Sequence, residues 1–209
     1  MTISRSVIRL NCFSILLVGL LIFFTQFFGL KVSDLFFHPY FSPNPNVALL
    51  TRTFQILCAV PVIVCTFTYG LAKTIQPRHP DNQFILFSAL VTGGFLLNEI
   101  YRIHIYMIGV GMPKLGVCLL YAVILSSYVW CFRRELKSTP YQILLTALGL
   151  LFLAIGVDTL KLQNQIIASL LEGVPKLFSE INIAFYYWYV CKCFVEKAVR
   201  KTVNNSVEI

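Results

Sequence analysis

The amino-acid sequence predicts an all-α membrane protein, a polytopic bundle of six transmembrane helices with both termini in the cytoplasm. Apolar residues make up 57% of the chain and charged residues 12%, a balance that a lipid-facing surface tolerates and a solvated surface does not. Five apolar runs reach the length of about 18 residues that crosses ~30 Å of hydrocarbon as a helix. A sixth run of similar length carries several charges. Together these runs predict a single integral membrane domain over residues 1–209.

The first apolar run follows Arg5 and Arg9, as in the basic start of a secretory signal. It closes on Phe27-Phe28-Gly29-Leu30 and contains no small-x-small cleavage site, so we expect an uncleaved first span. The segment 31–46 is rich in aromatic residues and proline, which suits the membrane interface or the cap of a pocket. The six predicted spans cover residues 11–30, 47–72, 83–107, 115–132, 141–160 and 168–195.

The orientation follows from the distribution of lysine and arginine, because cationic loops tend to stay in the cytoplasm. With the N-terminus inside, eleven of the 17 basic residues lie on the cytoplasmic side and six on the other. These residues form no continuous stripe, so the net charge of +8 reflects membrane topology and does not indicate a nucleic-acid partner. We therefore expect a multi-pass protein of the plasma (inner) membrane, with the lipid bilayer as its partner. The sequence does not define an oligomeric state.

Charged residues of four predicted spans fall at a similar depth when each residue adds ~1.5 Å of rise. Glu99 and Asp158 lie ~24 Å and ~26 Å above the cytoplasmic starts of their spans, and Arg102 is slightly higher than Glu99. Arg52 lies ~8 Å below the outer edge, and Lys176 and Glu180 lie in the same outer half. An unpaired charge in hydrocarbon costs a few kcal/mol, so such residues usually face inward and pair. The predicted result is a charge-balanced cluster near the outer leaflet.

Two local patterns extend this cluster. Glu172, Lys176 and Glu180 recur every four residues, which places a lysine between two carboxylates on one helical face, beside Pro175. In the third span Asn98 and Arg102 share a face, whereas His104 lies off that face unless the helix ends before it. The complete ligand-binding hypothesis comprises Arg52, Asn98, Glu99, Arg102, His104, Asp158, Glu172, Lys176 and Glu180.

Three function classes stay open for this cluster. The first is binding or movement of a small ligand, ion or lipid headgroup, because intramembrane charge commonly marks such a path. The second is a lipid-acting hydrolase that uses carboxylates with or without a metal. The third is a structural or assembly subunit in which buried ion pairs fix the helix register.

Signatures of particular cofactors are weak. A three-histidine zinc site would have to bridge opposite faces of the membrane, and only a mixed site of Glu99, His104 and Asp158, with His38 as a remote fourth ligand, is conceivable. No Gly-x-Ser-x-Gly elbow occurs. We therefore predict no metal and no cofactor, and we interpret the seven cysteines as small apolar packing residues. Tyr186-Tyr187-Trp188-Tyr189 is interpreted as part of an interfacial aromatic belt.

The second half of the chain resembles a loosely defined group of uncharacterised bacterial multi-span membrane proteins that show an acidic pair followed by histidine. The resemblance is carried by the run from Asn98-Glu99 to His104, by Gly111-Met-Pro-Lys114, by Asp158, and by the run from Leu171-Glu172 to Lys176. Asn98 stands where the group has an acid, and Ile105 where another acid is common. The resemblance implies a shared architecture and no known activity. A more distant resemblance is to ceramidase-like integral membrane hydrolases, whose histidine pair on the final helix has no counterpart here.

Overall fold

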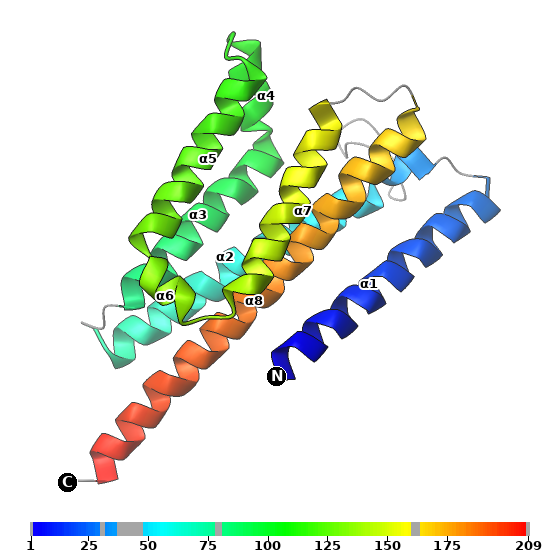
Figure 1. Ribbon diagram of the computed structural model, residues 1–209. Coiled ribbons are helices and arrows are strands. Elements are labelled where there is room, and N and C mark those ends of the chain that lie inside the picture. Colours follow the sequence, from blue (N-terminus) through cyan, green and yellow to red (C-terminus); the bar gives the residue numbers. More distant parts are fainter. Residues whose placement is uncertain (1, 30–31, 37–47, 78–80, 160–163, 208–209) are drawn as a thin grey trace. The chain divides into compact units, whose positions relative to one another are not determined.

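The computed structural model describes residues 2–29, 32–36, 48–77, 81–159 and 164–207, and these residues form helices without a β-strand (Figure 1). This confirms the all-α class. The described elements are α1 (Thr2–Phe27), the short 3-10 helix η1 (Val32–Phe36), α2 (Leu49–Ile75), α3 (Asp81–Tyr101), α4 (Ile103–Gly109), α5 (Lys114–Cys131), α6 (Arg133–Lys137), α7 (Tyr141–Thr159) and α8 (Gln165–Val207).

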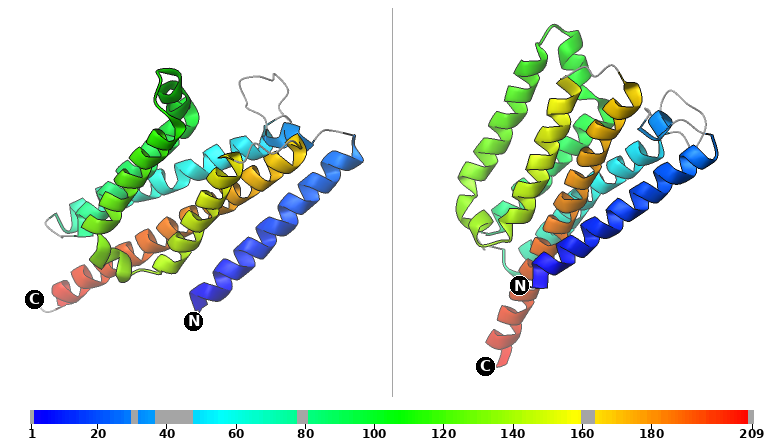
Figure 2. Two further views of the ribbon diagram at one scale, coloured as in Figure 1. Left: turned by 45° about the horizontal axis from the view of Figure 1, so that its top comes forward. Right: turned by 45° about the vertical axis from the view of Figure 1, so that its right-hand side comes forward.

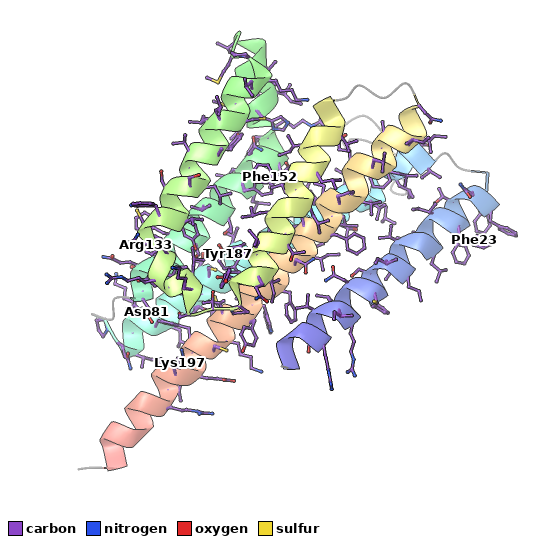
Figure 3. The ribbon with its side chains drawn as sticks, in the orientation of Figure 1. Phe23, Asp81, Arg133, Phe152, Tyr187 and Lys197 are labelled. Atoms are coloured by element: carbon purple, nitrogen blue, oxygen red, sulfur yellow. The ribbon has the colours of Figure 1, made fainter. Side chains whose placement is uncertain are left out.

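Four of these helices are long and apolar enough to cross a membrane. They are α1 from Arg5 onward, α2, α3 and α5, and α7 adds a shorter apolar segment, Tyr141–Val157. Large apolar side chains stand exposed along them, among them Phe23 on α1 at 64% and Phe152 on α7 at 61% (Figure 3). Exposed aromatic and aliphatic side chains at this density are what lipid tails, and not water, would cover.

The chain divides into two compact units. The first comprises residues 1–56 and 142–183, and the second comprises residues 57–141 and 184–209. The division cuts α2 and α8, so each unit contains a part of both helices.

In the first unit, α7 runs beside the N-terminal part of α8 (Figures 1 and 2). The hydroxyl of Ser179 on α8 donates to the carbonyl of Ala147 on α7 at 2.7 Å, and Ala147 is itself fully buried. A small residue at this point lets the two backbones approach closely, as is usual between helices in lipid. The helix α8 continues through Pro175 without a break.

In the second unit, α3 and α5 run antiparallel with α4 at the turn between them (Figure 1). Aromatic rings fill the other end of this hairpin: the Phe84 ring on α3 stacks on Tyr128 of α5 with centroids 6.3 Å apart, and Phe132 packs against both. The helix α2 passes near Gly93 of α3, where an added Cβ would lie in ordinary contact, 3.7 Å from Val62.

The predicted boundaries differ from the observed ones mainly in the third span and at the chain ends. The predicted span 83–107 is not one continuous helix, because α3 ends at Tyr101 and α4 starts at Ile103. Arg102 between them has φ 51° and ψ 43°, a left-handed conformation that cannot continue an α-helix. The last helix, α8, extends beyond the predicted 168–195 at both ends.

Candidate functional site

The candidate site is the break between α3 and α4, in the second unit. A non-glycine residue with positive φ, such as Arg102, is energetically costly and persists only where its surroundings hold it. The carbonyl of Arg102 accepts the backbone N–H of Ile105 at 2.8 Å, which starts α4. The polypeptide therefore changes direction at a charged residue and not at glycine or proline.

Asn98, one turn before the break, supplies the contacts that hold it. Its side-chain oxygen Oδ1 accepts three hydrogen bonds: from the backbone N–H of His104 at 3.0 Å, from Nδ1 of His104 at 3.1 Å and from the hydroxyl of Tyr121 on α5 at 2.7 Å. Asn98 is 5% exposed. One amide oxygen thus caps the first turn of α4, positions the imidazole and ties both to α5.

These contacts fix the tautomer of His104. A backbone N–H can only donate, so the Asn98 atom that faces it is the oxygen and not the amide nitrogen. The Nδ1 atom that faces the same oxygen must therefore carry a hydrogen. In the neutral imidazole the lone pair is then on Nε2, which is the ring atom that can accept a proton or a hydrogen bond.

Two residues of opposite charge precede this histidine in the sequence. Glu99 and Arg102 are both half-buried, and the carboxylate of Glu99 interacts electrostatically with Tyr121. Four of the nine residues of the ligand-binding hypothesis, Asn98, Glu99, Arg102 and His104, thus lie within one short segment, and the structure brings the side chains of Asn98 and His104 into direct contact.

The helix α4 that carries His104 has no buried residue. Ile105 is 46% exposed and Tyr106 is 72% exposed, and Val110 just after the helix is 91% exposed. His104 between them is half-buried. His104 therefore lies on a short helix whose exposed side chains suit lipid or the membrane interface.

The first unit contains the other predicted site residues. Glu180 on α8 is 2% exposed, and Arg52 on α2 and Glu172 on α8 are half-buried. The ammonium of Lys176 lies 4.8 Å from the ring centroid of Phe54, a cation–π contact. Because α8 is continuous, Glu172, Lys176 and Glu180 do share the face that their spacing predicts. Asp158 lies in α7, and its side chain is outside those that the structure describes.

The common layer of charges from four helices stays a prediction. Among the described residues no three His, Cys, Asp or Glu side chains converge in the manner of a metal site. His38, the remote fourth ligand in the mixed metal hypothesis, and the aromatic segment 37–46 lie outside the described residues, as does His79.

Sequence reasoning missed a buried hydroxyl network in the second unit. The Ser88 hydroxyl on α3 lies 2.7 Å from the Tyr128 hydroxyl on α5, which lies 3.4 Å from the Tyr187 hydroxyl on α8. Tyr186 is fully buried and pairs with the Thr139 hydroxyl at 2.8 Å, whereas Trp188 is 58% exposed. The interpretation of this tyrosine run as an interfacial belt is therefore wrong for Tyr186 and Tyr187. Their partners, Thr139 between α6 and α7 and Tyr128 on α5, can be found only by knowing which helices pack together.

Comparison with known proteins adds one match. No curated protein and no solved structure matches the chain. A family described as a domain of unknown function (DUF8692) matches residues 13–191, which extend from α1 into α8 and include the whole candidate site. This confirms the expectation of a family without an assigned activity. The chain belongs to this family of unknown function.

Proposed function

We propose that this chain is a multi-pass protein of the inner membrane that binds a lipid headgroup at the break between α3 and α4. Six crossings with both termini in the cytoplasm are part of the proposal. The four long apolar helices support it, as do the apolar segment of α7 and the length of α8. At ~1.5 Å per residue, a helix of the 43 residues in α8 is about twice as long as the hydrocarbon is thick.

The single observation that carries the headgroup proposal is the Asn98–His104 contact at the first turn of α4, a helix with exposed apolar side chains. Ile105 and Tyr106, which follow His104 on α4, have exposed side chains that lipid tails and interfaces accommodate. A lipid can place its headgroup at the polar cluster and keep its acyl chains along these residues. A free ion or a water-soluble ligand gains nothing from that apolar surface.

The charges beside His104 indicate the kind of headgroup. Glu99 and Arg102 have opposite signs and are three residues apart at the end of α3. A headgroup with both an amine and a phosphate matches this pair, because the guanidinium binds phosphate oxygens and the carboxylate binds an ammonium. We therefore propose a zwitterionic headgroup with a primary amine.

The test is lipid binding by purified protein in detergent, measured by native mass spectrometry with phosphatidylethanolamine, phosphatidylcholine and phosphatidylglycerol. We expect retention of phosphatidylethanolamine, and a loss of at least tenfold in Arg102→Gln and in Glu99→Gln. Arg134→Gln changes an exposed arginine on α6 and serves as the matched control. Equal retention of all three lipids by the wild type, or equal retention by wild type and both site variants, contradicts the proposal.

The same three hydrogen bonds also favour a structural role, in which the cluster only holds the helix break. In that case Asn98→Leu lowers stability while Arg102→Gln and Glu99→Gln leave lipid retention unchanged. The lipid-binding experiment therefore separates the two functions.

A further inference from the structure

Two buried cysteines from distant parts of the sequence meet in the second unit. Cys65 on α2 and Cys191 on α8 are 126 positions apart, and their Sγ atoms lie 3.8 Å apart in a thiol–thiol hydrogen bond. Their exposed fractions are 0% and 1%. Neither sulfur atom is in a disulfide in the structure, and the other five cysteines are not in disulfides either.

We propose that Cys65 and Cys191 form a reversible dithiol–disulfide site that is oxidised by a lipid-soluble quinone. This site is separate from the proposed headgroup site. For Cys65 and Cys191, this proposal replaces the interpretation of the cysteines as packing residues alone.

The geometry is close to that of a disulfide. An S–S bond is about 2.05 Å long, so the two sulfur atoms have to approach by roughly 1.8 Å. Rotation of both side chains about their Cα–Cβ bonds would bring the two sulfur atoms closer. No intervening side chain has to leave, because the sulfurs are already in contact.

The charge balance decides between a disulfide and a soft metal. Two thiolates could bind a monovalent soft cation such as Cu(I), but the resulting centre would carry a net negative charge. Burying such a charge is costly, and the exposed fractions of these cysteines show that water does not compensate it. A disulfide is neutral, so it suits the same surroundings.

Oxidation of the pair converts two thiols and one quinone into one disulfide and one quinol. Two S–H bonds break and one S–S bond forms, which releases two protons and two electrons. The quinone takes up both protons and both electrons and becomes a quinol. A quinone is the appropriate oxidant because it dissolves in lipid, and α2 is long and apolar enough to cross a membrane.

The product would join α2 and α8 covalently within the second unit. Cross-linking residues so far apart in sequence strongly restricts the unfolded chain, so we expect the oxidised form to unfold at a higher temperature than the reduced form.

The test uses the full-length protein in vesicles, in a variant that retains only Cys65 and Cys191. A short-chain benzoquinone is added without oxygen, and the protein is then denatured in N-ethylmaleimide and analysed by intact mass. We expect a product that is two hydrogen atoms lighter and not alkylated. Dithiothreitol should restore two alkylated thiols and lower the unfolding temperature again.

Cys58 provides the matched control. It is 1% exposed and lies on α2, seven residues before Cys65 and therefore about 10 Å along the helix. In a variant that retains only Cys58 and Cys191, both thiols should be alkylated after the same quinone treatment. Peptide mapping of the oxidised wild type gives a second readout that needs no substitution: a Cys65–Cys191 peptide supports the proposal. Two alkylated thiols, a quinone adduct or a bound soft metal in place of the disulfide would overturn it.

Discussion

Asn11 on α1 and Asn182 on α8 form a reciprocal pair of amide hydrogen bonds. The Nδ2 of Asn11 donates to Oδ1 of Asn182 at 3.0 Å, and the Nδ2 of Asn182 donates to Oδ1 of Asn11 at 2.9 Å. The second hydrogen of each amide goes to a backbone carbonyl, that of Val7 at 2.9 Å and that of Phe178 at 2.8 Å. Every amide hydrogen is thus used, and the pair joins the two helices of the first unit.

Asn182→Leu should lower the free energy of unfolding by about 1–2 kcal/mol, because it removes both interhelical bonds and leaves the amide of Asn11 without them. Asn11→Leu should have a similar effect. The double variant should be less destabilised than the sum of the two, since no amide is then left unpaired. Unfolding in detergent with increasing denaturant measures all three changes. Strict additivity of the two single changes would show that the two residues act independently.

Asn98→Leu should lower the free energy of unfolding by about 2–3 kcal/mol, because the backbone N–H of His104, its imidazole and the Tyr121 hydroxyl lose their common acceptor. Tyr121→Phe removes one of the three bonds and should cost about 1 kcal/mol. The imidazole provides an independent readout, since nitrogen NMR shifts of His104 report which ring nitrogen carries the hydrogen. We expect hydrogen on Nδ1 in the wild type and no such preference in Asn98→Leu. Hydrogen on Nε2 in the wild type would contradict the assigned tautomer.

The sequence predicts the helices well because their length and hydrophobicity follow from the thickness of a bilayer. The predicted span 115–132 and α5 differ by one residue at each end. The break at Arg102 could not be predicted, since no glycine or proline marks it and an arginine in a helical pattern ordinarily continues the helix. Asn98 and His104 were both selected as candidates, but their contact depends on this break.

The missed residues share another property: they are polar without being charged. Estimating depth from charged residues selects Glu180 on α8 and passes over its neighbour Asn182, which is 1% exposed. Tyr187 is missed for a related reason: a tyrosine near a predicted membrane boundary fits an interfacial belt as well as it fits a buried hydroxyl network. Uncharged polar groups cost less free energy to bury than charges, so they occur in apolar segments without marking a site. Their hydrogen-bond partners depend on which helices pack together, which the sequence does not show.

Gly173→Ala should destabilise the first unit, because an added Cβ would overlap the ring of Phe36 on η1. We expect a loss of about 1–3 kcal/mol, the usual cost of overpacking. Gly149→Ala on α7 is the matched control, since an added Cβ there meets no atom within 4 Å. Phe36→Ala in the Gly173→Ala background should recover a part of the loss. Equal stability of the Gly173→Ala and Gly149→Ala variants in denaturant unfolding would show that η1 does not pack on α8 as described.

The proposed topology predicts opposite accessibility for two exposed positions of the second unit. Met112, between α4 and α5, should face the outside, and Val199, near the end of α8, should face the cytoplasm. Basic residues surround Val199, including Lys197 and Arg200, and cationic segments are retained on the cytoplasmic side. In a background without other cysteines, a membrane-impermeant maleimide added to intact cells should label Met112→Cys and not Val199→Cys, and lysis should make both reactive. Labelling of Val199→Cys in intact cells would reverse the assigned orientation, because a helix end that carries these cations would then lie outside.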